Sequence, residues 1–260
     1  MESLLPERQF SQKWHIKGLL TVVLVILILF GSGQMTGVST DFSWDQFWQI
    51  LIKMTQPDWS YVSAIVTPIL ETIQMALVGT LLGTIIAVPF SLLAARNIMK
   101  NAVARGIIRF FLNLVRALPD LLLAALFVAI VGIGPMAGVG ALTVFSFGMI
   151  SKLFYEAIET IDDGPIEALT AAGANSIQTI VFAVVPQVFN QFLSYFLYTL
   201  EINVRASTVL GYLGAGGVGL YLSQTLSLFR YDRTAIVILA ILVVVIIVDG
   251  ISNRLREALA

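Results

Sequence analysis

Few side chains in this sequence are of a type that carries out chemistry. The 260 residues include no cysteine and a single histidine, His15, so a disulfide framework and a thiolate metal site are excluded, and a histidine-based metal site lacks ligands. No GxxxxGK[ST] pattern surrounds any lysine, and no serine, histidine and aspartate set could form a catalytic triad. We therefore expect a chain that is not an enzyme and that binds neither a metal ion nor ATP.

A few charged residues lie in apolar surroundings, where they are energetically costly and usually functional. Glu71 is the only charge in a long apolar stretch, and Arg205 stands beside Glu201 at the outer end of another. Two interpretations stay open for Glu71 and Arg205: a role in a polar pathway, or a position near the outer interface where they snorkel or pair with each other. Asp249, near the inner end of the last apolar stretch, is expected to cap or pair at the cytoplasmic interface with Arg254 or the basic loop; the alternative is a place in a proton path.

The elements that position these residues must be suited to lipid. Hydrophobic residues make up 58% of the chain, the mean hydropathy is +0.90, and only 12% of residues are charged. A soluble domain is about 25% charged. A water-soluble fold of this size could not bury so much apolar surface, so lipid must act as the solvent for part of the chain. The composition predicts an all-α, polytopic membrane protein.

About six stretches approach the roughly 20 apolar residues that one membrane crossing needs. We expect the third to bend around Pro119, with Arg116 and Asp120 in its first, interfacial turns. Gly79 and Gly83 form a GxxxG pair, which permits close helix approach. The first stretch lacks a small-x-small cleavage site, so an uncleaved span is predicted. The predicted spans cover residues 18–40, 63–94, 107–133, 136–155, 177–203 and 234–251.

Aromatic and basic residues predict how the spans are oriented. Residues 42–61 hold three tryptophans and Tyr61, which favour the membrane–water boundary, so an amphipathic interfacial stretch is expected outside. With the N-terminus inside, 11 of the 15 Lys and Arg residues fall on inner segments, which predicts cytoplasmic termini. The predicted organisation is a cytoplasmic flank at 1–17 and a transmembrane domain at 18–260, with a core at about 63–253 and a cytoplasmic loop at about 156–176.

The predicted cytoplasmic loop has internal order. Pro165 followed by Glu167 indicates a helix start, because proline is favoured at the first helical position and acids in the first turn. Apolar residues recur on one face as far as Gly173, which can end this helix, and Asn175 or Ser176 can cap the next. Two interpretations stay open: an ordinary interfacial helix between spans, or a docking surface for a partner protein with a matching groove.

The same segment resembles the signature of ABC importer permeases, in which Glu-Ala-Ala, three residues, Gly and nine residues precede Ile-x-Leu-Pro. Here the spacing from Glu167 through Gly173 to Pro186 matches in full, while Leu169, Ala183 and Val185 depart from the signature but stay apolar. The resemblance implies a type I importer permease fold and a coupling helix that seats in a cleft of a cytoplasmic ATPase. The residues that it assigns to this contact are Pro165, Glu167, Ala168, Leu169, Ala172, Gly173 and Ala174.

Two further segments resemble the phosphonate-uptake branch of this family. One is the stretch 203–219, and the other is Arg116-Ala117-Leu118-Pro119-Asp120. Methionine-importer permeases share the Gly-Ala-Gly-Gly part of the first segment but not its Asn-Val-Arg part. The resemblance favours the phosphonate and phosphite branch. It also motivates the hypothesis that Arg205 tunes a pathway for an oxyanion, because the planar donors of a guanidinium match such oxygens bidentately.

The glycines of this segment also fit the dinucleotide fingerprint, as Gly214-x-Gly216-x-x-Gly219. That motif needs a strand before it and a helix after it in a soluble βαβ unit, and this context is missing here. We interpret the glycines as gate-lining backbone or as helix-packing backbone, and both remain open. The predicted candidates for a pathway or gate are Glu71, Glu201, Asn203, Arg205, Gly214, Gly216 and Gly217.

The resemblance also implies partners. The chain is expected to pair with a second copy, to receive substrate from a periplasmic or lipid-anchored binding protein, and to couple transport to an ABC ATPase dimer that binds ATP and Mg²⁺. The expected location is the bacterial cytoplasmic (inner) membrane, in contact with lipid and without nucleic acid. Two alternatives stay open: a methionine-type amino-acid permease, and a secondary transporter driven by an ion gradient, which would need paired intramembrane acids or broken helices.

Overall fold

The computed structural model describes residues 21–24, 26 and 43–259. Within this part of the chain every regular element is a helix, which confirms the predicted all-α class. The chain divides into two compact units, Met1–Trp48 and Gln49–Ala260.

The first unit contains only a few described elements. The predicted flank at 1–17 lies outside the described residues, and so does most of the predicted span at 18–40. Helix α2 (Trp44–Met54) begins in this unit, and the ring of Phe47 packs edge-on against the rings of Trp44 and Trp48. Both tryptophans remain exposed, as expected for a helix that lies in a membrane interface.

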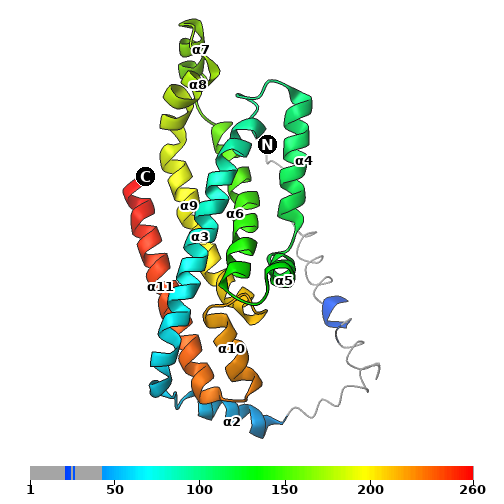
Figure 1. Cartoon of the computed structure of the whole chain (residues 1–260), viewed down its shortest axis with the longest axis vertical. Helices are drawn as coiled ribbons and strands as arrows, with labels where there is room; N and C mark the ends of the chain where they lie inside the picture. The colour runs from blue at the N-terminus through cyan, green and yellow to red at the C-terminus, as the bar shows by residue number, and fades with distance from the viewer. Residues whose placement is uncertain (1–20, 25, 27–42, 260) are drawn as a thin grey trace, which may run out of the picture. The chain divides into compact units, whose positions relative to one another are not determined.

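The second unit is a helical bundle whose two most closely packed helices are α3 (Val62–Ala94) and α6 (Pro135–Ile158), shown in Figure 1. The predicted GxxxG pair lies in their contact. A Cβ atom on Gly79 would lie 2.6 Å from the Cβ of Leu142, and one on Gly83 would meet an α6 side chain at 2.5 Å. A side chain at either position would push the helices apart, so the glycines set the distance between them.

Span three is bent, as predicted, but it begins earlier than expected. It consists of α4 (Ala102–Ala117) and α5 (Asp120–Val131), which meet at an angle of 85° beside Pro119. The predicted start near residue 107 is wrong, because the side chain of Asn101 accepts hydrogen bonds from the first backbone N–H groups of α4 and caps the helix there.

Span five is longer than predicted. It runs without a break through α8 (Ser176–Thr179), the π-helix η2 (Ile180–Val184) and α9 (Val185–Tyr212). The predicted end at residue 203 is wrong, because the charges near it find partners on a neighbouring helix and do not mark a membrane surface. After a glycine-rich turn, α10 (Val218–Ser227) leads to the last helix.

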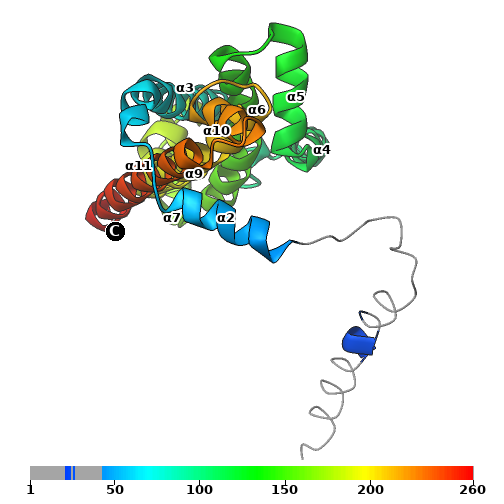
Figure 2. The ribbon, with the colours of Figure 1, turned by 90° about the horizontal axis from the view of Figure 1, so that it is seen from below.

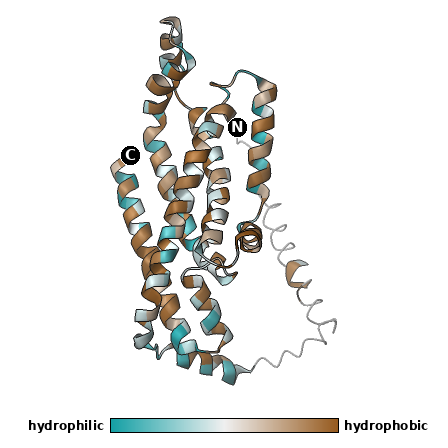
Figure 3. Ribbon diagram, viewed as in Figure 1, coloured by the Kyte–Doolittle hydropathy of each residue, from teal (hydrophilic) through white to brown (hydrophobic). Residues whose placement is uncertain are grey.

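Helix α11 (Tyr231–Leu259) is also longer than its predicted span at 234–251. It packs against α9, α10 and α3, and Figure 2 shows these helices from one end of the bundle. Four helices of the described residues are long and apolar enough to cross a membrane, or five if the bent pair α4–α5 counts as one span. The remaining predicted span, at 18–40, lies mostly outside the described residues. Figure 3 shows hydrophobic residues along the bundle, and many remain exposed, as lipid contact requires.

A polar cluster ties the starts of α3 and α11 together. The guanidinium of Arg233 lies 3.2 Å from the carboxylate of Asp58 and 4.9 Å from the centre of the Tyr61 ring. Hydrogen bonds from the side chains of Ser60 and Arg233 hold the pKa of Asp58 below its ordinary value. The cluster lies at the opposite end of the bundle from the hairpin described next.

Candidate functional site

The predicted coupling segment forms a helical hairpin that projects beyond the other helices at one end of the bundle (Figure 1). Helix α7 (Gly164–Ala171) has Pro165 and Glu167 in its first turn, as predicted. Gly173, the residue after its C-cap, has a φ of +84°, which favours glycine. The N–H groups of Gly173 and Ala174 donate to carbonyls of the last turn, which completes a Schellman motif.

The second arm of the hairpin starts at Asn175. Its side chain accepts a hydrogen bond from the backbone N–H of Gln178 at 2.9 Å, and the side chain of Gln178 accepts one from the N–H of Asn175 at 2.8 Å. This reciprocal capping box fixes the start of α8. Of the two caps left open by the sequence, the structure uses Asn175.

One face of α7 packs on the bundle and the other faces outward. Ile166 packs against the apolar cluster that contains Ile158 and Val184, which holds the helix to the bundle. The predicted contact residues therefore divide into two groups. Leu169 and Ala174 are half-buried, whereas Pro165, Glu167, Ala168, Ala172 and Gly173 are exposed. The outward face could be covered by a partner protein, and the half-buried residues position it.

An exposed apolar strip continues from the hairpin into span five, and the sequence analysis did not identify it. Its members recur at helical spacing along α8, η2 and the start of α9. The 3.6-residue recurrence of these apolar residues is visible in the sequence, but a lipid-facing span predicts the same recurrence. The strip consists of Ile177, Val181, Phe182, Val185 and Phe189.

A network of four charged side chains joins α9 to α11. Arg205 Nη2 lies 2.5 Å from Glu201 Oε1 and 2.7 Å from Asp249 Oδ2. Arg256 Nη2 lies 2.9 Å from the other oxygen of Glu201 and also donates to Asn253. Two arginines thus meet two carboxylates. The predicted pairing of Asp249 with Arg254 or the basic loop is wrong, and so is the pairing of Arg205 with Glu71.

The network lies halfway along the bundle. Asn203, two residues from both Glu201 and Arg205, is fully buried. Its amide nitrogen donates to the hydroxyl of Thr80 at 2.7 Å and to that of Ser146 at 2.6 Å, and these residues lie near the middle of α3 and of α6. The expectation that Arg205 lies near the outer interface is therefore wrong.

The glycine-rich turn between α9 and α10 is packed tightly against the rest of the bundle. Gly214, Gly216 and Gly217 are buried and have positive φ values. A Cβ atom on Gly216 would lie 2.8 Å from the backbone nitrogen of Pro135, and one on Gly217 would lie 2.5 Å from the hydroxyl of Thr72. Of the two interpretations of these glycines, the geometry matches helix packing.

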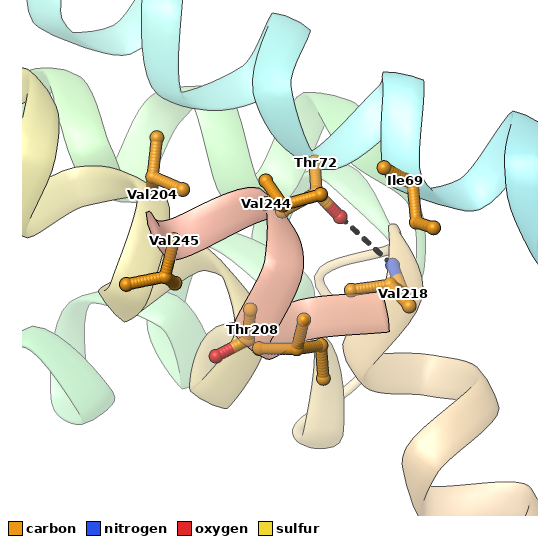
Figure 4. A pocket seen from close by; sticks show the side chains of 8 residues that line it. Ile69, Thr72, Val204, Thr208, Val218, Val244 and Val245 are labelled. Carbon is orange, nitrogen blue, oxygen red and sulfur yellow. Dashed lines mark hydrogen bonds between the residues drawn. The ribbon is translucent and has the colours of Figure 1, made fainter. Parts of the chain in front are cut away.

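Figure 4 shows the place where this turn meets α3. The backbone N–H of Val218 donates to the Thr72 hydroxyl at 2.8 Å, beside an apolar crevice that Ile69, Val204 and Val245 also line. The crevice has no charged side chain. Glu71, one residue before Thr72, is half-buried, and no ion pair joins it to another of the described residues.

Among the described residues no cluster of three or more His, Asp or Glu side chains could hold a metal ion. The two features that stand out are a protruding hairpin suited to protein contact and a charge network at mid-depth. Together they are suited to a transport protein.

Comparison with known proteins agrees with this assignment. Residues 87–259 match the family model of the binding-protein-dependent transport system inner membrane component. The chain belongs to this family. It is thus a multi-pass membrane component of a transport system, and the match favours such a system over a carrier driven by an ion gradient.

The similar sequences include permeases for phosphorus compounds. The chain is 40% identical over 201 residues to the phosphite transport system permease protein PtxC of Stutzerimonas stutzeri, covering 77% of this chain and 73% of that protein. It is 40% identical over 189 residues to the phosphate-import permease protein PhnE of Mycolicibacterium smegmatis, covering 73% of this chain but 36% of that protein.

Among solved structures, the inward-facing MetNI methionine ABC transporter is similar, with a TM-score of 0.70 over 78% of this chain and 99% of that chain. The sequence identity is 24%, so this likeness shows the fold alone. The predicted type I importer permease architecture is thereby confirmed.

Proposed function

We propose that this chain is the membrane subunit of an ATP-driven importer for a phosphorus oxyanion such as phosphite or a phosphonate. The observation that carries the proposal is its 40% identity to a phosphite permease over 77% of the chain. A tetrahedral oxyanion also suits the mid-depth arginine, because a guanidinium binds such oxygens through paired N–H donors.

The partners follow from the hairpin. We propose that the outward residues around Glu167 seat in a cleft of a cytoplasmic ABC ATPase, and that two copies of this chain pair so that an ATPase dimer meets two hairpins. ATP and Mg²⁺ bind to the ATPase, and this chain is not catalytic. Both termini lie in the cytoplasm, and a periplasmic or lipid-anchored binding protein docks at the opposite, α10 end.

Coupling follows from the continuity of span five. The second arm of the hairpin, α8, runs through η2 into α9 with no unstructured link, and α7 joins it through the turn at Gly173, so a displacement of α7 by the ATPase is passed to one continuous helix. That element carries Glu201, Asn203 and Arg205 to the centre of the bundle. The proposed mechanism therefore couples ATPase movement directly to the charge network.

Co-purification tests the ATPase contact. Glu167→Arg places a positive charge on the exposed face of α7, and we expect it to release the ATPase from the permease in detergent. Glu257→Arg makes the same charge change at an exposed site near the end of α11, and the complex should survive it. Retention of the ATPase by the Glu167→Arg variant would argue against the hairpin as the docking site.

Uptake by proteoliposomes that hold the permease, its ATPase and its binding protein tests the substrate class. We expect ATP-dependent uptake of phosphite or methylphosphonate, and none of methionine. Uptake of methionine alone would favour the amino-acid branch. Transport without any ATPase, abolished by an ionophore, would favour a secondary transporter.

A further inference from the structure

Arg205 is the centre of a stripe on α9 in which four of the five residues are exposed. The stripe residues recur every three or four positions and so lie on one face of the helix. Its two ends are phenol side chains, and between them Arg205 has 48% of its side chain exposed. The α9 stripe consists of the exposed residues Tyr198, Arg205, Val209 and Tyr212 and of the half-buried Ile202.

This stripe cannot face lipid at its centre. Asn203 fixes the depth of Arg205, because its hydrogen bonds to Thr80 and Ser146 place it at the middle of α3 and α6. A charged side chain at that depth is costly in hydrocarbon and is found beside a water-filled cavity or a protein surface. The α9 stripe therefore faces an aqueous path or the second copy that encloses one.

The hydrogen bonds of Arg205 leave part of its guanidinium available. A guanidinium has five N–H donors, and both carboxylate contacts of Arg205 use the same nitrogen, Nη2. Its Nε and Nη1 donors make no hydrogen bond to any described residue. Each two-donor edge of the guanidinium includes Nη2, however, so an oxyanion can gain a bidentate contact only by displacing a carboxylate.

The two carboxylates differ in how firmly they are held. Glu201 uses one oxygen for Arg205 and the other for Arg256, and its side chain is 12% exposed. Among the described residues, Asp249 has Arg205 as its only ionic partner and its buried Oδ1 atom has no hydrogen-bond partner, while its side chain is 29% exposed. Asp249 is therefore the carboxylate that an incoming anion displaces more readily.

We propose that Arg205, placed at mid-depth between Glu201 and Asp249, is a transfer site at which a tetrahedral phosphorus oxyanion takes the place of Asp249 during transport. The assignment of the anion rests on the proposed function. The charges of the two arginines and the two carboxylates cancel, so the site holds an anion weakly. Weak binding suits a site that a substrate must both enter and leave. Asp249 acts as the resident competitor that releases the anion.

The test uses the importer reconstituted with its ATPase and binding protein, and phosphite as the probe. Asp249→Asn keeps the shape of the side chain but removes the competing charge. In detergent, phosphite should raise the thermal midpoint of the importer relative to the same concentration of chloride. The phosphite concentration that gives half of the maximal rise should be about tenfold lower in Asp249→Asn than in the wild type. Maximal uptake should fall as well, because the anion leaves more slowly.

Arg205→Lys is the second variant. It keeps the positive charge that Glu201 and Asp249 need, so the bundle should fold, but a lysine offers no planar fork. We expect uptake to fall about tenfold or more, while stimulation of ATP hydrolysis by the binding protein stays within about twofold of wild type. The retained ATP hydrolysis separates loss of the transfer site from loss of assembly.

A matched arginine serves as the control. Arg254 is exposed on α11, one turn and a half beyond Asp249, and no ion pair joins it to another described residue. Arg254→Lys should transport as wild type. Wild-type uptake by Arg205→Lys, or an unchanged half-saturation in Asp249→Asn, would overturn the transfer site. A wild-type importer that takes up no phosphorus oxyanion would instead overturn the proposed function.

Discussion

At the scale of single residues, Asn203 joins three helices through one side chain. It is fully buried on α9 and donates to hydroxyls on α3 and α6, so it fixes both the rotation and the depth of α9. Asn203→Ala should lower the free energy of unfolding by about 1–2 kcal/mol, because hydrogen bonds between membrane helices contribute about 0.6–2 kcal/mol each. The thermal midpoint of the purified permease measures this. Asn113→Ala, on an exposed face of α4, is the control, and equal midpoints for the two variants would contradict the assigned role.

At the scale of elements, the turn between α9 and α10 is defined by close backbone contacts. A Cβ atom on Gly219 would lie 1.9 Å from the carbonyl oxygen of Thr208, a backbone atom that cannot move aside. Gly219→Ala should therefore prevent α10 from docking and abolish monodisperse permease in size-exclusion chromatography. Gly250→Ala, in open space on α11, should accumulate normally, because alanine favours a helix over glycine by about 1 kcal/mol. Normal accumulation of both variants would show that the turn tolerates rearrangement.

The hairpin and the end of span five differ in how well the sequence predicts them. Local signals predicted the hairpin correctly, because Pro165, Gly173 and Asn175 act through backbone geometry within a few residues. The end of span five was missed, because Glu201 and Arg205 look like surface charges until their partners on α11 are known. Such partners are distant in sequence: 44 residues separate Arg205 from Asp249. Periodicity and composition do not encode which two helices pack together.

At the scale of the whole molecule, the described bundle has two dissimilar ends. The hairpin α7–α8 projects from one, and α10 lies toward the other (Figure 1). The proposed function requires the hairpin to face the cytoplasm, which the distribution of Lys and Arg also predicts. The charge network lies between the ends, on the continuous element that begins at the hairpin. Sidedness therefore decides whether ATP-driven movement can reach Arg205 at all.

Cysteine labelling tests this orientation without background, because the chain has no cysteine of its own. Ala171→Cys places a thiol at the exposed end of α7, and Ser227→Cys places one at the exposed end of α10. In spheroplasts, a membrane-impermeant maleimide should label the Ser227→Cys variant at once and the Ala171→Cys variant only after lysis. Each variant is the other's accessibility control, since both thiols should react fully in detergent. The reverse labelling pattern would put the hairpin outside the cell, where no ATPase could reach it. That result would contradict both the coupling role of Glu167 and the transmission of movement through α9.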